Sequence, residues 1–92
     1  MFRIWGKIFK DNHLLQDMVY ENSDPDLNRT RKVYAGLHEF CMAFDLQKPI
    51  WLEKNITEFK RSDKTRFYQD NFIEQIDFDY LEIQVIEEDG GE

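Results

Sequence analysis

The histidines and the cysteine of this sequence, whose side chains can bind metal ions or act as nucleophiles, are His13, His38 and Cys41. His38 and Cys41 are three residues apart, so both could project from one side of a helix. A structural zinc site needs about four ligands, and the chain has one cysteine and no ligand pair at the spacing of a zinc-binding turn. Cys41 also falls within an apolar helical pattern, where a thiol packs as a small hydrophobic group. We therefore predict no metal site, no cofactor site and no Cys–His nucleophile.

Carboxylates near the C-terminus form the second group that could carry chemistry. They are Asp70, Glu74, Asp77, Asp79 and Glu82. Two carboxylates can act as acid and base when a cleft holds them and separates their pKa values. The spacing predicts no such cleft, and residues 77–79 lack the ligand series and the glycine of a calcium loop. Solvated carboxylates with local ion pairs are the favoured interpretation, so we predict a protein without catalytic activity.

Residues 59–68 mix cations with aromatic rings, a combination that can bind a nucleic-acid strand through its phosphates and bases. The candidate residues of this basic-aromatic loop are Lys60, Arg61, Lys64, Arg66 and Phe67. Residues 49–68 contain five bases and three acids, whereas residues 69–92 contain nine acids and no Lys or Arg. We expect the acidic segment to lie near the basic one and neutralise it, or the loop to be simply solvated.

The N-terminal residues show the alternation of a β-hairpin. In residues 2–9, one side carries Phe2, Ile4, Gly6 and Ile8, and the other carries Arg3, Trp5, Lys7 and Phe9. Residues 10–13 are turn-like, because Asp and Asn tolerate the backbone angles of a tight turn. Residues 14–20 form the predicted second strand.

A long helix is predicted from Pro25 to about Phe44. Ser23 or Asp24 can cap its first amides, and proline is favoured in the first helical turn. The apolar arc consists of Leu27, Val33, Tyr34, Leu37, Phe40, Cys41 and Phe44, with Lys32 and Gly36 on the opposite side. Residues 45–49 end this helix, because the residue before a proline avoids helical angles. A shorter helix is expected over residues 49–60.

The remaining residues predict one further strand. Residues 61–64 are expected to form a loop, residues 65–68 are ambiguous, and Asp70 can cap one or two helical turns. Residues 78–87 alternate as a strand. The order strand, strand, helix, helix, strand (ββααβ) predicts a single two-layer α+β domain over residues 1–87. It contains a small antiparallel sheet, made of the hairpin and the C-terminal strand, packed against one long and one or two short helices. Residues 88–92 are expected to be an acidic solvated tail.

We expect the C-terminal strand to pair with the first strand, so that Arg3 and Lys7 face Glu82 across the sheet. The helices would cover one face and leave large aromatic side chains on the other. Such side chains need cover from the chain or from a partner, and they are common binding anchors. The candidate interaction surface is Trp5, Phe9, Trp51, Tyr80 and Glu82. Alternatively, the second helix with Trp51 wraps around to cover Trp5 and Phe9.

Composition sets the broad class of the protein. The 92 residues make one domain, and 41% hydrophobic residues can supply a core. One cysteine permits no internal disulfide and favours a reducing compartment. The sequence shows no signal peptide and no apolar membrane span, so a cytoplasmic protein is predicted. A net charge of −7 disfavours tight nucleic-acid binding and anionic membranes.

Two functions of different classes follow. The first is a small acidic protein-interaction module without catalytic activity, whose partner is a second copy of the chain or another protein. The alternative is a nucleic-acid-related protein, which contacts a single strand through residues 59–68 or mimics DNA with its carboxylates. A small enzyme ranks last, because no residues predict a pocket with converging polar groups.

Overall fold

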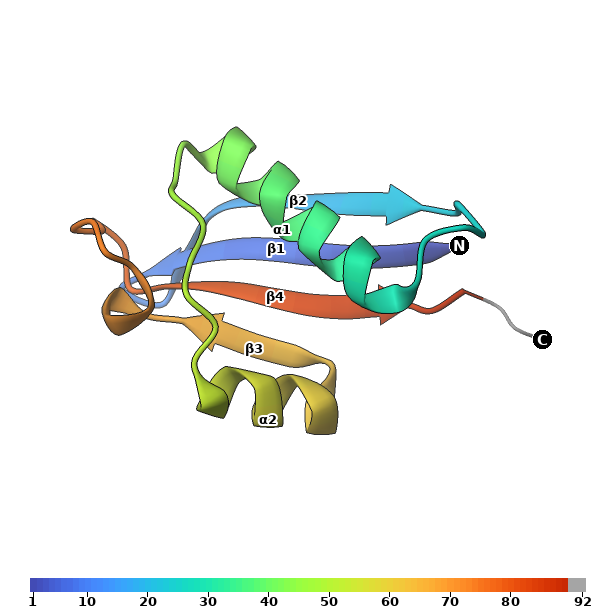
Figure 1. The fold of residues 1–92 in the computed structure, drawn as a ribbon. Helices are drawn as coiled ribbons and strands as arrows, with labels where there is room; N and C mark the ends of the chain where they lie inside the picture. The colour runs from blue at the N-terminus through green and yellow to red at the C-terminus, as the bar shows by residue number, and fades with distance from the viewer. Residues whose placement is uncertain (90–92) are drawn as a thin grey trace.

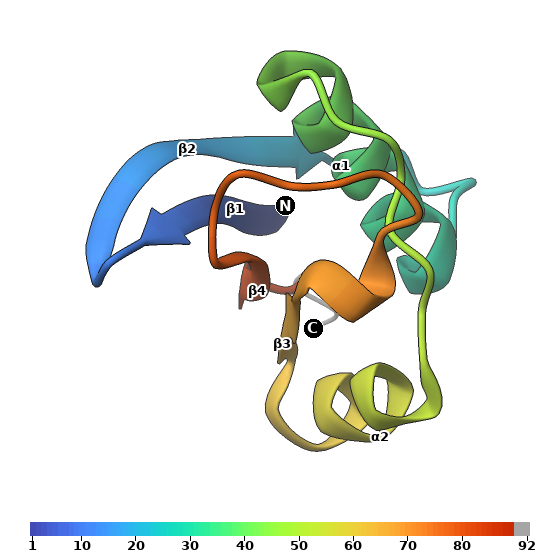
Figure 2. The same cartoon turned by 90° about the vertical axis from the view of Figure 1, so that its left-hand side faces the viewer.

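The computed structural model describes residues 1–89, which form one antiparallel sheet with two helices beside it (Figure 1). The strands are β1 (Phe2–Lys10), β2 (His13–Asn22), β3 (Lys64–Phe67) and β4 (Tyr80–Glu87), in the order β2-β1-β4-β3 across the sheet. The helices are α1 (Arg29–Phe44) and α2 (Glu53–Ser62), and a short 3-10 turn spans Gln69–Asn71. Both helices lie on the same side of the sheet (Figure 2).

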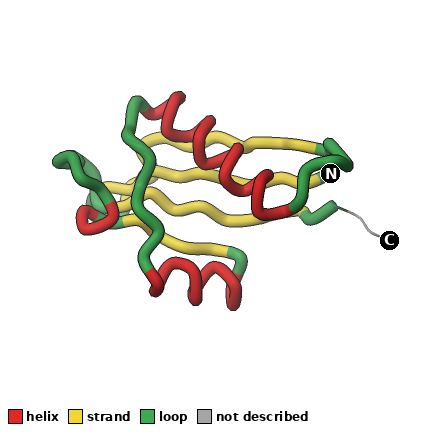
Figure 3. Tube along the Cα trace, in the orientation of Figure 1, coloured by secondary structure: helices red, strands yellow, loops and turns green. Residues whose placement is uncertain are grey.

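The predicted α+β class is confirmed, but the sheet has one strand more than expected. Residues 64–67 form β3, an edge strand that pairs antiparallel with β4. The predicted loop over residues 61–64 is wrong, since α2 continues to Ser62 and leads almost directly into β3 (Figure 3). The strand reads Lys-Thr-Arg-Phe and has only one apolar side chain, so it shows no apolar alternation, and the sequence left this region ambiguous.

β1 and β2 form the predicted hairpin, which turns at Asp11 and Asn12. Both residues have positive φ angles, 52° and 65°, which Asp and Asn adopt more readily than other side chains. The Asp11 amide donates a hydrogen bond to Asp79 Oδ2 at 2.8 Å. The turn is therefore tied to the segment that enters β4.

β4 pairs with β1, as the sequence predicts. Lys7 lies opposite Glu82, and Lys7 Nζ is 2.7 Å from Glu82 Oε2. Arg3 does not face Glu82. It forms ion pairs with Glu21 on β2 and Glu87 on β4, because the register places these two carboxylates directly beside it.

α1 begins at Arg29 instead of Pro25. Asn28 is its N-cap, and Asn28 Oδ1 accepts a hydrogen bond from the Arg31 amide at 2.9 Å. Upstream, the side chain of Asn22 accepts a hydrogen bond from the Asp24 amide, and the side chain of Asp24 accepts one from the Asp26 amide. Side-chain bonds of this kind compete with helical hydrogen bonds, so the helix starts after them.

α1 packs against the sheet at two glycines. A Cβ atom on Gly6 would lie 2.5 Å from the Phe40 ring, and one on Gly36 would lie 2.7 Å from Cγ2 of Ile4. A side chain at either position would push helix and sheet apart. The core joins Phe2, Ile4 and Ile8 of β1 to Val33, Leu37, Phe40 and Cys41 of α1. The predicted solvent position of Gly36 is therefore wrong, because the strands β1 and β2 contact it.

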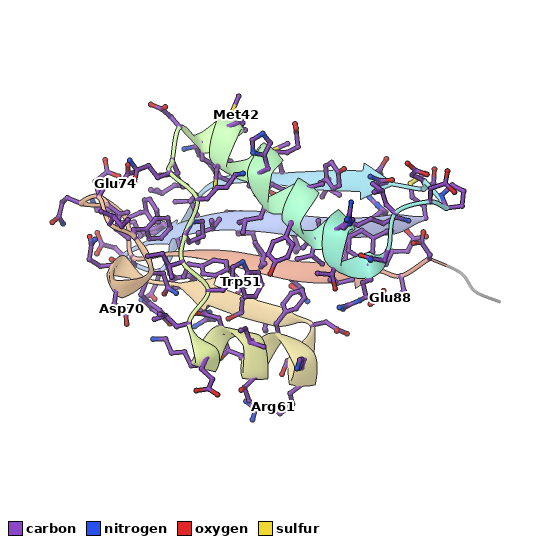
Figure 4. The ribbon with its side chains drawn as sticks, viewed as in Figure 1. Met42, Trp51, Arg61, Asp70, Glu74 and Glu88 are labelled. Atoms are coloured by element: carbon purple, nitrogen blue, oxygen red, sulfur yellow. The ribbon has the colours of Figure 1, made fainter. Side chains whose placement is uncertain are left out.

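The acidic segment after β4 is bound to α1. Arg29 Nε lies 3.1 Å from Glu88 Oε2, and Lys32 Nζ lies 2.6 Å from Asp89 Oδ2 (Glu88 is labelled in Figure 4). Lys32 was predicted on the solvent side of the helix, but it is 1% exposed. Of the predicted solvated tail, Glu88 and Asp89 are exposed and ion-paired, and residues 90–92 lie outside the described residues.

Two buried asparagines hold α2, β3 and the 3-10 turn together. Asn55 Nδ2 donates hydrogen bonds to Thr65 Oγ1 and to the Arg66 carbonyl, both at 2.9 Å. Asn71 Nδ2 donates to Asn55 Oδ1 at 2.7 Å and to the Ile50 carbonyl at 2.8 Å. Both asparagines are fully enclosed, so an unpaired group here would be costly. The network fixes β3 at the edge of the sheet.

Candidate interaction surface

The side of the sheet opposite the helices is the open face. Its members follow from the register, because directly paired residues of neighbouring strands point to the same side. They are Arg3, Trp5, Lys7 and Phe9 of β1, Leu14, Asp17, Val19 and Glu21 of β2, Lys64 and Arg66 of β3, and Tyr80, Glu82, Gln84 and Glu87 of β4. Neither α1 nor α2 lies over this face (Figure 2).

Four charged residues form one row across the open face, here called the charged row. From β2 through β1 and β4 to β3, its members are Asp17, Lys7, Glu82 and Arg66. The Lys7–Glu82 ion pair is continued by Arg66, whose Nε lies 2.9 Å from Glu82 Oε1. The signs alternate along the row, so every charge lies beside an opposite one, which stabilises neighbouring strands.

The centre of the charged row is shielded from water. Glu82 is 4% exposed and Lys7 is 8% exposed. Burial by itself raises the pKa of Glu82, but the hydrogen bonds from Lys7 and Arg66 outweigh it and hold this pKa below its ordinary value. The hydrogen bond to Glu82 also raises the pKa of Arg66. Glu82 and Arg66 are therefore both charged at neutral pH, and their charges are opposite.

Aromatic rings flank the charged row. Lys7 Nζ lies 3.9 Å from the centre of the Trp5 ring, and the Arg66 guanidinium lies 4.5 Å from that of Tyr80. Phe9 stacks on Tyr80 with ring centres 5.2 Å apart. Trp5 and Phe9 are half-buried by these neighbours. The alternative in which the second helix covers them is wrong, since α2 lies on the other side of the sheet.

Trp51 lies apart from the other four residues of the predicted surface, which share the open face. It fills the space between α1 and α2 on the helix side (Figure 4). Its ring centre is 5.9 Å from that of Tyr34 on α1, 5.6 Å from that of Phe59 on α2 and 5.1 Å from that of Phe67 on β3. Trp51 therefore packs the helices together and does not belong to the open face.

The predicted basic-aromatic loop is divided between a helix and a strand. Lys60 and Arg61 lie on α2, whereas Lys64 and Arg66 lie on β3. Phe67 is fully buried, so its ring is not available for stacking on a base. A shallow hollow of about 190 Å³ beside β3 is lined by Glu58, Arg61, Ser62, Lys64, Thr65, Arg66 and Tyr68.

The cysteine and the histidines do not form a site. Cys41 is in the core, and burial raises the pKa of its thiol to about 11, so the thiol is protonated at neutral pH. His13 and His38 are exposed. Within residues 1–89, no group of three or more His, Cys, Asp or Glu side chains is arranged to hold a metal ion.

Two of the late carboxylates, Asp70 and Glu82, pair with different cations. Asp70 Oδ2 lies 3.4 Å from Lys54 Nζ, and Glu82 belongs to the charged row. These two contacts bring the acidic C-terminal region beside the basic segment before it, as the charge polarity suggested. Residues 87–89 instead pair with the N-terminal strand and α1, so the polarity predicted only part of the pairing.

Two members of the charged row, Asp17 and Arg66, were not predicted to lie beside Lys7 and Glu82. Counting back from the hairpin turn would place Gln16 opposite Lys7, and only the register shift between Ile8 and Phe9 brings Asp17 there instead. Arg66 could not be placed beside Glu82, because β3 had not been predicted. The burial of Asn55 and Asn71 could not be predicted, since nothing in their spacing distinguishes buried from exposed amides.

Compared with known protein families, curated proteins and solved structures, the chain gives no match. In the described part of the chain, no helix is long and apolar enough to cross a membrane. Fold and surface together define the class: a two-layer α+β protein whose sheet presents an open face with alternating charges and aromatic rings.

Proposed function

We propose that this chain is a non-catalytic protein-interaction module that binds its partner through the open face. The observation that supports this most is the charged row, which lies between half-buried aromatic rings on a face that neither helix covers. Aromatic side chains commonly anchor interfaces, and polar groups around them give orientation and specificity.

The internal pairing of charges favours a protein surface as the ligand. Burying an unpaired charge is expensive, but a charge that keeps its opposite partner loses much less on burial. Lys7, Glu82 and Arg66 are already paired, so a partner can cover them without leaving a charge unmatched. The aromatic rings beside them then supply apolar contact area.

The nucleic-acid alternative has weaker support. Affinity for a strand comes from cations that replace the counterions of phosphates. On the open face, Arg3, Lys7 and Arg66 are engaged by carboxylates, and the whole chain has a net charge of −7. The hollow beside β3 offers cations, but Glu58 lies among them.

A capture experiment with matched variants tests the proposed function. Val19 lies on the open face and is 37% exposed, whereas Met42 lies on α1 and is 70% exposed. Val19→Glu and Met42→Glu make the same chemical change on opposite sides of the protein. We expect wild type and Met42→Glu to retain one protein from source-cell lysate, with or without nuclease, and Val19→Glu to lose it.

Equal capture by the two variants would refute binding through the open face. Capture that disappears when nuclease is added would transfer support to the nucleic-acid alternative. Both variants are first checked for wild-type circular dichroism and unfolding transitions, so that a loss of capture reports the surface and not a loss of fold.

A further inference from the structure

The order of charges in the charged row is complementary to the same order read in the opposite direction. Read from β2 to β3, the signs are negative, positive, negative and positive, for Asp17, Lys7, Glu82 and Arg66. Read in the opposite direction, the signs are positive, negative, positive and negative. Two copies of the open face therefore match charge for charge when one is laid on the other with the strand order reversed.

One symmetry axis produces this arrangement. A two-fold axis that runs parallel to the strands, between two facing sheets, places β2 over β3 and β1 over β4 of the second copy. Asp17 then faces Arg66 of the second copy, and Lys7 faces Glu82 of the second copy. A two-fold axis perpendicular to the strands would instead place β2 over β2, with acid facing acid, which is unfavourable.

Two other rows of the open face agree with the same axis, whereas the Trp5 row adds no complementarity, since reversal places Val19 over Lys64 and Trp5 over Gln84. Phe9 of β1 is paired with Tyr80 of β4, so reversal places each of these rings over the other kind of ring. Arg3 is paired with Glu87, so reversal places cation over carboxylate again. The parallel axis also leaves the strands of both copies aligned, which is the common geometry for two sheets packed face to face.

The projected area of the open face is smaller than the accessible area that each partner of a specific dimer buries. β1 has nine residues and four strands lie side by side, so at ~3.3 Å per residue and ~4.8 Å per strand the face projects roughly 500 Å², allowing for the short β3. Side-chain relief increases the accessible area above this projection. Specific interfaces bury about 800 Å² on each partner.

We infer that the open face is a homodimer interface, in which a second copy of this chain packs sheet to sheet about a two-fold axis parallel to the strands. This inference rests on the proposed function and names its partner. Exchange of charges at the two ends of the row tests it, because Asp17 and Arg66 are exposed and Lys7 and Glu82 themselves stay unchanged. Arg66→Glu removes one of the two cations bound to Glu82, so both variants are first checked for wild-type circular dichroism and unfolding transitions.

The test uses Asp17→Lys and Arg66→Glu, with self-association measured by sedimentation equilibrium over a concentration series. In a homodimer of either variant, like charges face each other at two symmetry-related contacts. We expect each variant alone to associate about tenfold more weakly than wild type, or worse. An equimolar mixture places the introduced lysine of one chain opposite the introduced glutamate of the other, and we expect it to regain association near the wild-type strength.

Matched controls separate this effect from net charge. Glu39→Lys and Arg31→Glu make the same charge changes at exposed positions of α1, and we expect wild-type association from both. Equal weakening by these controls would overturn the inference, and so would single variants that associate like wild type or a mixture that regains nothing.

A wild-type protein that stays monomeric up to its solubility limit would overturn the homodimer but not the proposed function. In that case, selective loss of capture by Val19→Glu would still support an open face that binds another protein. Loss of that selectivity together with a monomeric wild type would refute both proposals.

Discussion

The two faces of β1 carry alternate residues of one nine-residue strand, yet they are stabilised in different ways. On the helix face, Phe2 and Ile4 are fully buried against α1, and Gly6 lets Phe40 approach the backbone. On the open face, Lys7 is almost as enclosed, but by the Glu82 carboxylate and the Trp5 ring. Enclosure on the first face comes from a helix packed over the sheet, whereas on the second it comes from side chains of β1 and of the neighbouring strand β4.

This comparison shows that low exposure does not by itself mark a hydrophobic core. Glu82 is 4% exposed although neither helix lies above it. Its shielding depends on Lys7 and Arg66, which also neutralise it. A face built in this way can be stable in a monomer and still accept a partner, because its charges are matched before and after burial.

The largest contrast is expected between two phenylalanines. Phe40 of α1 is fully buried against Gly6 of β1, whereas Phe9 is half-buried on the open face. We expect Phe40→Ala to lower the free energy of unfolding by about 3–5 kcal/mol, because it leaves a cavity in the core. Phe9→Ala should cost about 1 kcal/mol, for less lost burial and one lost ring contact. Urea unfolding measures both, and equal losses would contradict the distinction between the faces.

The second contrast concerns the centre of the charged row. Glu82→Leu leaves Lys7 enclosed without its carboxylate, and we expect a loss of about 2–3 kcal/mol in the free energy of unfolding. Adding Lys7→Met replaces the pair with apolar side chains and should recover most of that loss. Thermal and urea unfolding of the single and double variants check this. A double variant that is less stable than Glu82→Leu would show that Lys7 contributes by some route other than this pair.

The smallest effect is expected for an ion pair at the periphery. Lys54 and Asp70 lie 3.4 Å apart, and their side chains are 57% and 60% exposed. Water screens such a pair, so Asp70→Asn should change the free energy of unfolding by less than about 0.5 kcal/mol. The measurement is the same urea titration. A loss in the free energy of unfolding as large as that of Glu82→Leu would mean that Asp70 stabilises the protein through contacts other than its ion pair with Lys54.

Much of the fold could be predicted because its signals are local. Strict alternation in residues 2–9 separates the two faces of β1, and the Asp11–Asn12 turn fixes the hairpin. The apolar spacing of α1 places Val33, Leu37 and Phe40 in the core, as found. The Lys7–Glu82 pair followed from placing the last strand beside the first. Each of these inferences needs only the period of one element and the sign of a few charges.

The predictions of side-chain position were wrong where the surroundings of a residue depend on a segment distant in the sequence. On the helical wheel Gly36 lies at the margin of the apolar arc, one turn before Phe40, where β1 and β2 contact it. Lys32 lies outside that arc, but the segment after β4 pairs with it. Trp51 is of a residue type that is common among binding anchors. Only the arrangement of α1 and α2 shows that it packs between helices. A side chain's periodic position says which way it points, but not what lies there.

The sequence alone determined the hairpin, the long helix and the alternation that sends charged and aromatic side chains to one side of β1, because neighbouring residues fix the backbone period. Only the tertiary structure decided that residues 64–67 are a strand, since four residues form a strand only when β4 supplies hydrogen bonds and the buried Asn55–Asn71 network holds them at the edge. That placement brings Arg66 beside Glu82 and completes the charged row. The row spans four strands, and its order exists only once the sheet has formed.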